Sequence, residues 1–233
     1  MVDERTVVVI GATHGLGNGV ASHYAQQGRR VVISGRDAGR AAEAAVELGE
    51  KVSGIALDLA GPSGIGPALA DVGEVDRLVI AGIDRDQNRV RDYDVELAIR
   101  LVTMKMVGYM EVVHALASHL SEDASVMMFG GLAKERPYPG STTVTSVNAG
   151  VTGMVRTLVN ELAPIRVNAI HPGIVADSPY WAPKAEGVEA ARARTPTGRS
   201  VLMADVTDAA VFLLENPSMN GVDLPVDGGW SLP

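Results

Sequence analysis

The part of this sequence that most constrains its fold is a run of β-branched residues followed directly by a glycine-rich turn. Residues 7–10 are Val-Val-Val-Ile, and such an unbroken apolar run predicts a strand buried on both faces, as in a parallel sheet. Glycines follow at positions 11, 15 and 17, and residues 20–28 are predicted to form a helix that ends at glycine. A strand, a glycine turn and a helix in this order bring backbone N–H groups and the positive end of a helix against a phosphate. The stretch therefore predicts a phosphate or dinucleotide site; the alternative is an ordinary tight turn that binds nothing.

Length, composition and charge narrow the classes of protein further. The chain has 233 residues, 46% of them hydrophobic, and no apolar run long enough to span a membrane, which predicts one soluble α/β domain. It contains no cysteine, which excludes disulfides, thiolate metal sites and a cysteine nucleophile, and no His/Asp/Glu spacing suggests a metal site. The formal net charge of -8 argues against nucleic acid and anionic membranes as partners. The charged start leads straight into the first strand, so we expect no signal peptide and a cytoplasmic protein.

Strand and helix patterns alternate along the rest of the chain. This alternation predicts a doubly wound parallel sheet of the Rossmann type in a single α/β domain, residues 1–233. The expected strands after the first cover residues 29–36, 52–58, 75–82, 125–131, 165–170 and 223–226. The expected helices cover 38–48, a short stretch after the Gly/Pro-rich residues 61–67, 95–120, 141–162 and 205–214. The segment at about 174–201 is polar and marked by prolines, which predicts a lid or substrate loop.

Two residues at the ends of predicted strands bear on the choice of nucleotide. In dinucleotide folds the end of the second strand meets the adenosine ribose, where an acidic side chain favours the free 2′-hydroxyl of NAD. This chain instead has Gly35 followed by Arg36, whose positive charge suits a 2′-phosphate. The sequence therefore favours NADP(H) over NAD, with a plain surface role for Arg36 as the alternative. Asp58 lies at the end of the third strand, where it can hold the adenine amine.

Five motifs, in order, resemble those of the short-chain dehydrogenase/reductase family, and the resemblance covers nearly the whole chain. They are Gly-Ala-Thr-His-Gly-Leu-Gly at 11–17, Ala-Gly at 81–82, Asn-Ala-Gly-Val-Thr-Gly at 148–153, Glu-Leu-Ala-Pro-Ile-Arg-Val-Asn-Ala-Ile-His-Pro-Gly at 161–173 and Val-Asp-Gly-Gly at 226–229. The resemblance implies NAD(P)(H) binding, a small-molecule substrate, and a homodimer or homotetramer built on the two long helices. With Arg36 and Asp58, the expected cofactor contacts are Gly11, Thr13, His14, Gly15, Leu16, Gly17, Leu59, Ala81, Gly82, Lys105, Asn148, Pro172, Gly173, Val175 and Asp177.

The resemblance also implies a catalytic set, and this sequence departs from it. Family members use a tyrosine as general acid/base, a lysine four residues later, a serine after the fifth strand and an asparagine in the preceding long helix. The ungapped alignment places Val144 at the tyrosine position and Asn148 at the lysine position. The serine position falls on Gly131 or its neighbour Gly130, and the asparagine position on Lys105. Valine and glycine carry no transferable proton, so the usual set is expected to be absent.

Lys105 and Asn148 replace the family's asparagine and lysine, so the two residue types have traded places. A cation and an amide would then both remain near the nicotinamide ribose. Lys105 stands among apolar residues such as Met104 and Met106, which suggests a largely buried helix where an unpaired lysine would be costly. We therefore favour a cofactor-site and catalytic role for Lys105 over that of a solvated helix lysine, because partial desolvation would suit it to proton transfer.

Four further side chains are weighed individually. Tyr138 lies in the loop above the expected nicotinamide and could supply a phenol, or it packs between two prolines. His14 in the glycine turn is expected to tune cofactor binding rather than chemistry. His171 is expected to be a strand-end imidazole bonded to backbone. Asp177 stands where the family usually has a threonine, and it could accept from the carboxamide NH₂ of the nicotinamide.

Three functions remain open at this point. The first is an NADP(H)-dependent oxidoreductase with a rearranged active site that passes hydride to or from a small carbonyl, enone or imine. The second is a catalytically inactive NADP(H)-binding protein that acts as a sensor or assembly partner. The third is a non-redox lyase or isomerase. The exchange of Lys105 and Asn148 favours the first, because random decay would not be expected to restore a lysine nearby, and the retained phosphate turn argues against the third.

Overall fold

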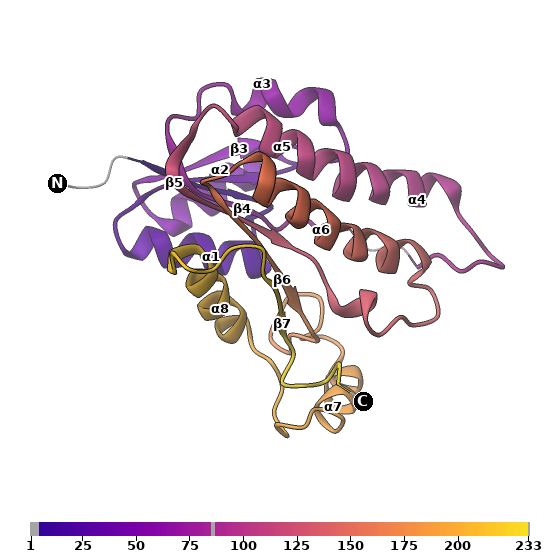
Figure 1. Ribbon diagram of the computed structural model, residues 1–233. Coiled ribbons are helices and arrows are strands. Elements are labelled where there is room, and N and C mark those ends of the chain that lie inside the picture. The colour runs from indigo at the N-terminus through magenta and orange to yellow at the C-terminus, as the bar shows by residue number, and fades with distance from the viewer. Residues whose placement is uncertain (1–4, 85–86, 233) are drawn as a thin grey trace.

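The computed structural model describes residues 5–84 and 87–232 and shows a seven-stranded parallel sheet between helices (Figure 1). The strand order is β3-β2-β1-β4-β5-β6-β7, so the chain runs outward from β1 to β3, crosses back, and then runs outward from β4 to β7. The point of reversal lies between β1 and β4, which is where open α/β sheets bind ligands. The strands are β1 Thr6–Ile10, β2 Arg30–Gly35, β3 Val52–Ala56, β4 Val75–Ile80, β5 Leu120–Phe129, β6 Arg166–Pro172 and β7 Asp223–Val226. The predicted doubly wound sheet is confirmed.

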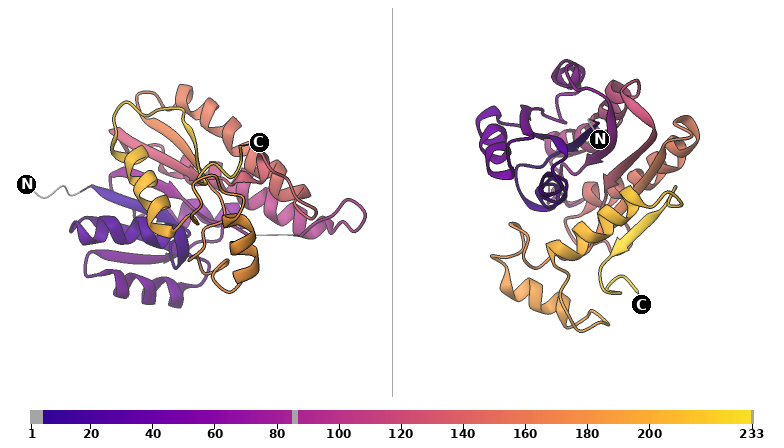
Figure 2. Two further views of the ribbon diagram at one scale, coloured as in Figure 1. Left: turned by 90° about the horizontal axis from the view of Figure 1, so that it is seen from below. Right: turned by 90° about the vertical axis from the view of Figure 1, so that its left-hand side faces the viewer.

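Two groups of helices cover the two faces of this sheet (Figures 1 and 2). One face carries α1 Gly15–Gln26, α2 Ala38–Leu48 and α8 Met203–Glu215. The other carries α3 Ile65–Leu69, α4 Val95–Val102, α5 Tyr109–Leu116 and α6 Thr142–Glu161. The short helices η1 Pro62–Gly64 and η3 Leu132–Lys134 precede α3 and follow β5. The sheet therefore has a hydrophobic core on each side.

Strand β1 shows why its apolar run is unbroken. Val7 and Val9 are buried in the core beneath α1 and α8, whereas Val8 and Ile10 are buried in the core beneath α3, α5 and α6. Successive side chains of a strand point to opposite faces, so a strand covered on both faces must be apolar at every position.

The long helix expected over residues 95–120 differs from the structure. It is divided into α4, a π-helical segment η2 Thr103–Gly108, and α5, and it ends at Leu116. Strand β5 then starts at Leu120, five residues earlier than expected. A π-turn contains one residue more than an α-turn and leaves no signature in hydrophobic periodicity. Gly108 is the last residue of this segment. A Cβ on Gly108 would lie 2.2 Å from the carbonyl oxygen of Leu59, so the helix lies very close to the backbone at Leu59.

The segment from about 174 to 201 also contains structure that the sequence pattern did not predict. Helix α7, Ala185–Arg192, forms within it, with Arg192 bonded to Glu189 three residues earlier. Its mean hydropathy is low and Ala191 is the one buried residue among its eight, so little apolar sequence marks it as a helix. The lid role of the segment stays a prediction.

Within residues 5–84 and 87–232, no helix is both long and apolar enough to cross a bilayer. In the same residues, no three His, Asp or Glu side chains gather into a group that could hold a metal ion.

Candidate active site

The glycine turn between β1 and α1 has the shape of a phosphate cradle. Gly11 has φ +82°, and a Cβ there would lie 2.7 Å from the nitrogen of Gly82. A Cβ on Gly17 would lie 2.4 Å from the carbonyl oxygen of Gly11, so α1 packs tightly on the turn. At Gly15, with φ +67°, the nearest atom to a Cβ is Pro179 Cδ at 3.9 Å. The space that a side chain would fill there is open and lies beside the first N–H groups of α1, which is the environment that a phosphate requires.

The expected phosphate-contact residues all lie in this turn or in the first turn of α1: Gly11, Thr13, His14, Gly15, Leu16 and Gly17. The Thr13 hydroxyl lies 3.2 Å from His14 Nδ1, and His14 itself is exposed at the start of α1. Two residues that the sequence did not single out brace the turn. Ser34 Oγ accepts from a turn N–H at 3.2 Å, and Asn18 Nδ2 donates to a turn carbonyl at 3.2 Å. Their role depends on contacts between segments, which no local motif reveals.

Four charged residues meet at the end of the sheet where the adenosine is expected. Arg36 Nη1 lies 3.6 Å from Asp84 Oδ2, and Arg100 Nε lies 3.4 Å from the same oxygen. Arg100 Nη2 also lies 3.6 Å from Asp58 Oδ1, and the same oxygen of Asp58 accepts from the N–H of Ala60. The structure thus brings together Arg36 and Asp58, which the sequence singled out, with Asp84 and Arg100, which it did not.

Small residues let the backbone segments of the nucleotide site approach one another. A Cβ on Gly82 would lie 2.4 Å from Leu59 Cδ1, and the Ala81 N–H donates to the carbonyl of Ile10 at 2.8 Å. Leu59, Ala81 and Gly82, all expected cofactor contacts, therefore lie side by side after β3 and β4.

Lys105 is buried, as its apolar neighbours predicted. Only 1% of its surface is exposed, and its Nζ donates to the Phe129 carbonyl at 2.5 Å and to Tyr109 Oη at 2.8 Å. Tyr109 Oη donates in turn to the Gly82 carbonyl at 2.7 Å. Lys105 thus belongs to the π-helical segment η2, and its ammonium lies at the carboxyl ends of β4 and β5. Such π-turns are frequent at functional sites.

Asn148 and Val144 lie on α6 and are both buried. A Cβ on Gly131 would lie 2.8 Å from Asn148 Nδ2, and a Cβ on Gly130 would lie 2.2 Å from His171 Nδ1. A serine at either glycine would therefore displace a buried neighbour. Gly130 thus lies directly against the His171 ring, and Gly131 lies directly against the Asn148 amide.

The His171 imidazole accepts a hydrogen bond from the backbone, as expected. The Gly131 N–H donates to its Nδ1 at 3.1 Å, and its Nε2 lies 2.8 Å from Asp223 Oδ1, which also accepts from Thr152 Oγ1. This network assigns the ring proton to Nε2. Burial lowers the pKa of His171 below its usual 6.5 and outweighs the opposing effect of the Asp223 hydrogen bond, so the imidazole is neutral at pH 7.

The residues expected at the nicotinamide end follow β6. Pro172 ends the strand, the Gly173 N–H donates to the Val226 carbonyl, and Val175 is buried. Asp177 Oδ1 accepts from the N–H of Met203 at 2.8 Å, so one of its oxygens serves the start of α8.

Tyr138 lies half-exposed on the loop between η3 and α6. The loop is fixed by Ser141, whose Oγ donates to the Tyr138 carbonyl at 2.7 Å and accepts from its N–H at 3.0 Å. Ser141 Oγ in turn lies 2.9 Å from Thr145 Oγ1 on α6. The backbone of Tyr138 is thus held in place while its ring stays near solvent.

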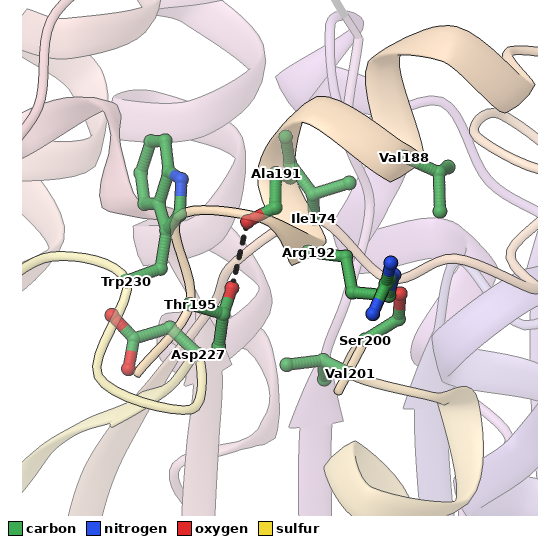
Figure 3. A pocket seen from close by; sticks show the side chains of 9 residues that line it. All are labelled: Ile174, Val188, Ala191, Arg192, Thr195, Ser200, Val201, Asp227 and Trp230. Atoms are coloured by element: carbon green, nitrogen blue, oxygen red, sulfur yellow. Dashed lines mark hydrogen bonds between the residues drawn. The ribbon is translucent and has the colours of Figure 1, made fainter. Parts of the chain in front are cut away.

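Two cavities border this region. Figure 3 shows the first, a small pocket beside α7 that is also lined by Ile174, Val201 and Trp230, with Thr195 Oγ1 bonded to the Ala191 carbonyl. Its volume is about 10 Å³, which is room for one water molecule. The second has about 270 Å³ and is lined by Leu132, Lys134, Glu135, His171, Asp223, Pro225, Ser231 and Leu232.

The chain is similar in sequence and in structure to known proteins. Residues 11–231 match a family model described as enoyl-(acyl carrier protein) reductase. The chain is 31% identical over 236 residues to carbonyl reductase family member 4 of Danio rerio, with 98% of each chain covered. It is similar to the solved structure of a short chain dehydrogenase/reductase family protein, with a TM-score of 0.89, 26% identity and 99% of each chain covered. It is also similar to 3-ketoacyl-(acyl-carrier-protein) reductase from Brucella melitensis complexed with NADH, with a TM-score of 0.87, 28% identity and full coverage of both chains.

Proposed function

We propose a specific reaction for this chain, which belongs to the short-chain dehydrogenase/reductase family and is an NAD(P)-dependent oxidoreductase of that type. The reaction is hydride transfer between NADP(H) and a small carbonyl, enone or imine, at a site that lacks the family's usual serine, tyrosine and lysine. The observation that carries the proposal is the buried ammonium of Lys105, held at the carboxyl ends of β4 and β5.

The nucleotide would lie across the glycine turn, with its diphosphate at Gly15 and the adenosine between Asp58 and Gly82. When bound, the nicotinamide gives or takes the hydride. Arg36 supports NADP(H), because its guanidinium lies on an exposed side chain at the end of β2, where a 2′-phosphate could replace Asp84 as its partner. A relative of known structure was solved with NADH, so the fold by itself does not decide between the two nucleotides.

Three side chains of this protein would manage the substrate and its proton. Lys105 would deliver the proton, directly or through a water molecule, because Val144 offers none. Asn148 would hold the substrate or the nicotinamide ribose by its amide. Tyr138 is the second candidate donor, since its backbone is fixed while its ring lies near solvent.

The names of the relatives suggest which substrates to try first. The similar structure is a 3-ketoacyl-(acyl-carrier-protein) reductase, which suggests a 3-oxoacyl thioester, and the family model's description suggests an enoyl thioester. A polarised carbonyl or enone needs less acid catalysis than an isolated ketone, which suits a site without a tyrosine. The segment at about 174–201 would close over the substrate as a lid.

A catalytically inactive NADP(H)-binding protein is the second candidate. It is favoured by Val144 and Gly131, which leave the two best-known catalytic positions without a proton donor. The two candidates differ in one observable, because only the enzyme consumes NADPH when a substrate is added. A lyase or isomerase has less support, since the glycine turn keeps the space for a diphosphate.

We also propose that the protein forms homo-oligomers through α4 and α6. On α4, Val95, Ile99 and Val102 expose 55%, 54% and 41% of their surface, and their i, i+4, i+7 spacing places them on one face. An exposed apolar stripe of this kind is typical of a surface that a partner covers.

The first test is a fluorescence titration of the wild-type protein with NADPH and with NADH at matched salt. We expect micromolar binding with NADPH preferred, and we expect Arg36→Ala to reduce that preference about tenfold, because it removes a charged contact to the 2′-phosphate. Arg40→Ala, which changes an exposed arginine four residues later, in the first turn of α2, is the matched control. An unaltered ratio in Arg36→Ala would remove Arg36 from the ribose site.

A further inference from the structure

Two side chains of one helix and two backbone carbonyls converge at the carboxyl ends of β4 and β5. Lys105 and Tyr109 lie four residues apart, and the carbonyls belong to Gly82, which follows β4, and Phe129, which ends β5. Tyr109 is fully buried and Lys105 almost so. The motifs of the sequence did not single out Tyr109, and the reaction proposed above assigns it no role.

The directions of the hydrogen bonds show what the phenol does there. Tyr109 has one hydroxyl proton, and the carbonyl of Gly82 at 2.7 Å is its nearest acceptor, with that of Phe129 at 3.3 Å. With the proton committed to a carbonyl, the phenol oxygen is free to accept from Lys105 Nζ at 2.8 Å. Burial also raises the pKa of Tyr109 far above its usual value of 10, so the phenol remains neutral. Tyr109 is therefore an acceptor for Lys105 rather than a proton donor to a substrate.

The location of Lys105 Nζ depends on such acceptors. A lysine side chain has a flexible four-carbon stem, and its ammonium is strongly hydrated, so burial is favourable only where protein atoms replace the lost water. Phe129 O and Tyr109 Oη replace part of that water from two sides, and the Tyr109 ring lies 4.5 Å from Nζ. The hydroxyl also bonds the Gly82 carbonyl, so one phenol ties the lysine to the backbone of the nucleotide site.

We infer that Tyr109 is a positioning residue that fixes the Lys105 ammonium relative to the nicotinamide half of NADP(H). The inference rests on the proposed function, because it assigns Lys105 to the cofactor site. It adds a residue to that site which never touches cofactor or substrate and which acts only through Lys105.

The test compares two ligands across four proteins. NADPH carries the nicotinamide riboside, and adenosine 2′,5′-bisphosphate carries only the adenosine half with its 2′-phosphate. Titrations would use the wild type, Tyr109→Phe, Lys105→Met and the double variant. Tyr109→Phe and Lys105→Met should each weaken NADPH binding about tenfold, as expected for losing a hydrogen bond to a charged group. Binding of the bisphosphate should change less than twofold, and the double variant should bind NADPH no more weakly than Lys105→Met.

Tyr24→Phe is the matched control, because it also removes a buried phenol, one that bonds Glu215 at 2.6 Å beneath α8. It should leave the affinity for both ligands unchanged. Unchanged NADPH affinity in Tyr109→Phe, or equal weakening of both ligands, would overturn the inference while the proposed function stands. Failure of the wild type to bind either ligand would overturn the proposed function, and the inference with it.

A second measurement does not depend on any ligand. The chain has four lysines, Lys51, Lys105, Lys134 and Lys184, so side-chain ¹⁵N labelling of lysine gives few signals. We expect one ammonium signal protected from solvent exchange, absent in Lys105→Met, and shifted with faster exchange in Tyr109→Phe. A Lys105 signal that is identical in the wild type and in Tyr109→Phe would contradict the positioning role.

Discussion

At the scale of single residues, the end of β5 is shaped by two buried side chains, His171 and Asn148, that pack against Gly130 and Gly131. A Cβ on Gly130 would lie 2.2 Å from His171 Nδ1, and one on Gly131 would lie 2.8 Å from Asn148 Nδ2, so a side chain at either position requires its neighbour to shift. Asn148 is buried on α6, and Lys105 Nζ donates to the carbonyl of Phe129, the last residue of β5. Restoring the serine alone is expected to disturb the packing rather than to restore the family's chemistry.

The buried imidazole of His171 predicts a dependence of stability on pH. Burial lowers its pKa from 6.5, so the unfolded chain binds a proton that the folded chain rejects. Its contribution to the free energy of unfolding is therefore complete above about pH 6.5 and is lost as the pH falls below that value, by at most about 1.4 kcal/mol per pH unit. Urea denaturation of wild type and His171→Gln at pH 7.5 and 5.5 should show a smaller loss in the variant. His114→Gln, at an exposed histidine of α5, should lose as much stability as wild type between pH 7.5 and 5.5. Equal losses in all three proteins would exclude His171 as a source of the pH dependence.

At the scale of elements, local patterns were informative and contacts between distant segments were not. The β1–turn–α1 unit was predictable because strand, glycines and helix are consecutive in the sequence and each has its own local residue pattern. Lys105 and Asn148 could be singled out by comparison with the family's motifs. Asp84 and Arg100 were missed because their ion pairs join segments that are distant in the sequence. Tyr109 lies one helical turn after Lys105, but its role depends on the carbonyls of Gly82 and Phe129, which no spacing in the sequence records.

The π-helical segment η2 gives a prediction at the same scale. Gly108→Ala would place a Cβ 2.2 Å from the Leu59 carbonyl, a backbone atom that cannot move aside cheaply. We expect the helix to shift away from Leu59, a loss of about 1–3 kcal/mol in the free energy of unfolding, and weaker NADPH binding. Gly153→Ala on α6 meets nothing within 4 Å and is the control, which should stabilise the helix slightly. Equal stability of the two variants would show that the close approach of Gly108 to Leu59 is unimportant.

At the scale of the whole molecule, the exposed face of α4 and the deeply buried Lys105 belong to the same continuous helical stretch. Burying the Val95–Val102 face against a second copy would steady the helix that carries the proposed catalytic group. Ile99→Glu should lower the mass measured by light scattering after size exclusion, because it places a charge in the apolar stripe. Glu96→Gln, at an exposed residue of the same helix, should leave the mass unchanged. A wild-type mass equal to one chain would contradict the proposed assembly.

The measurement that tests the account most directly is the oxidation of saturating NADPH in the presence of a 3-oxoacyl thioester, an enone and an imine, for wild type and Lys105→Met. The account predicts that wild type turns over at least one substrate, and that kcat falls about 100-fold or more in Lys105→Met at concentrations where NADPH binding is saturated. Two results would contradict it: bound NADPH that no substrate oxidises, which would make the chain a binding protein, or an unchanged kcat in Lys105→Met, which would move the proton donor elsewhere.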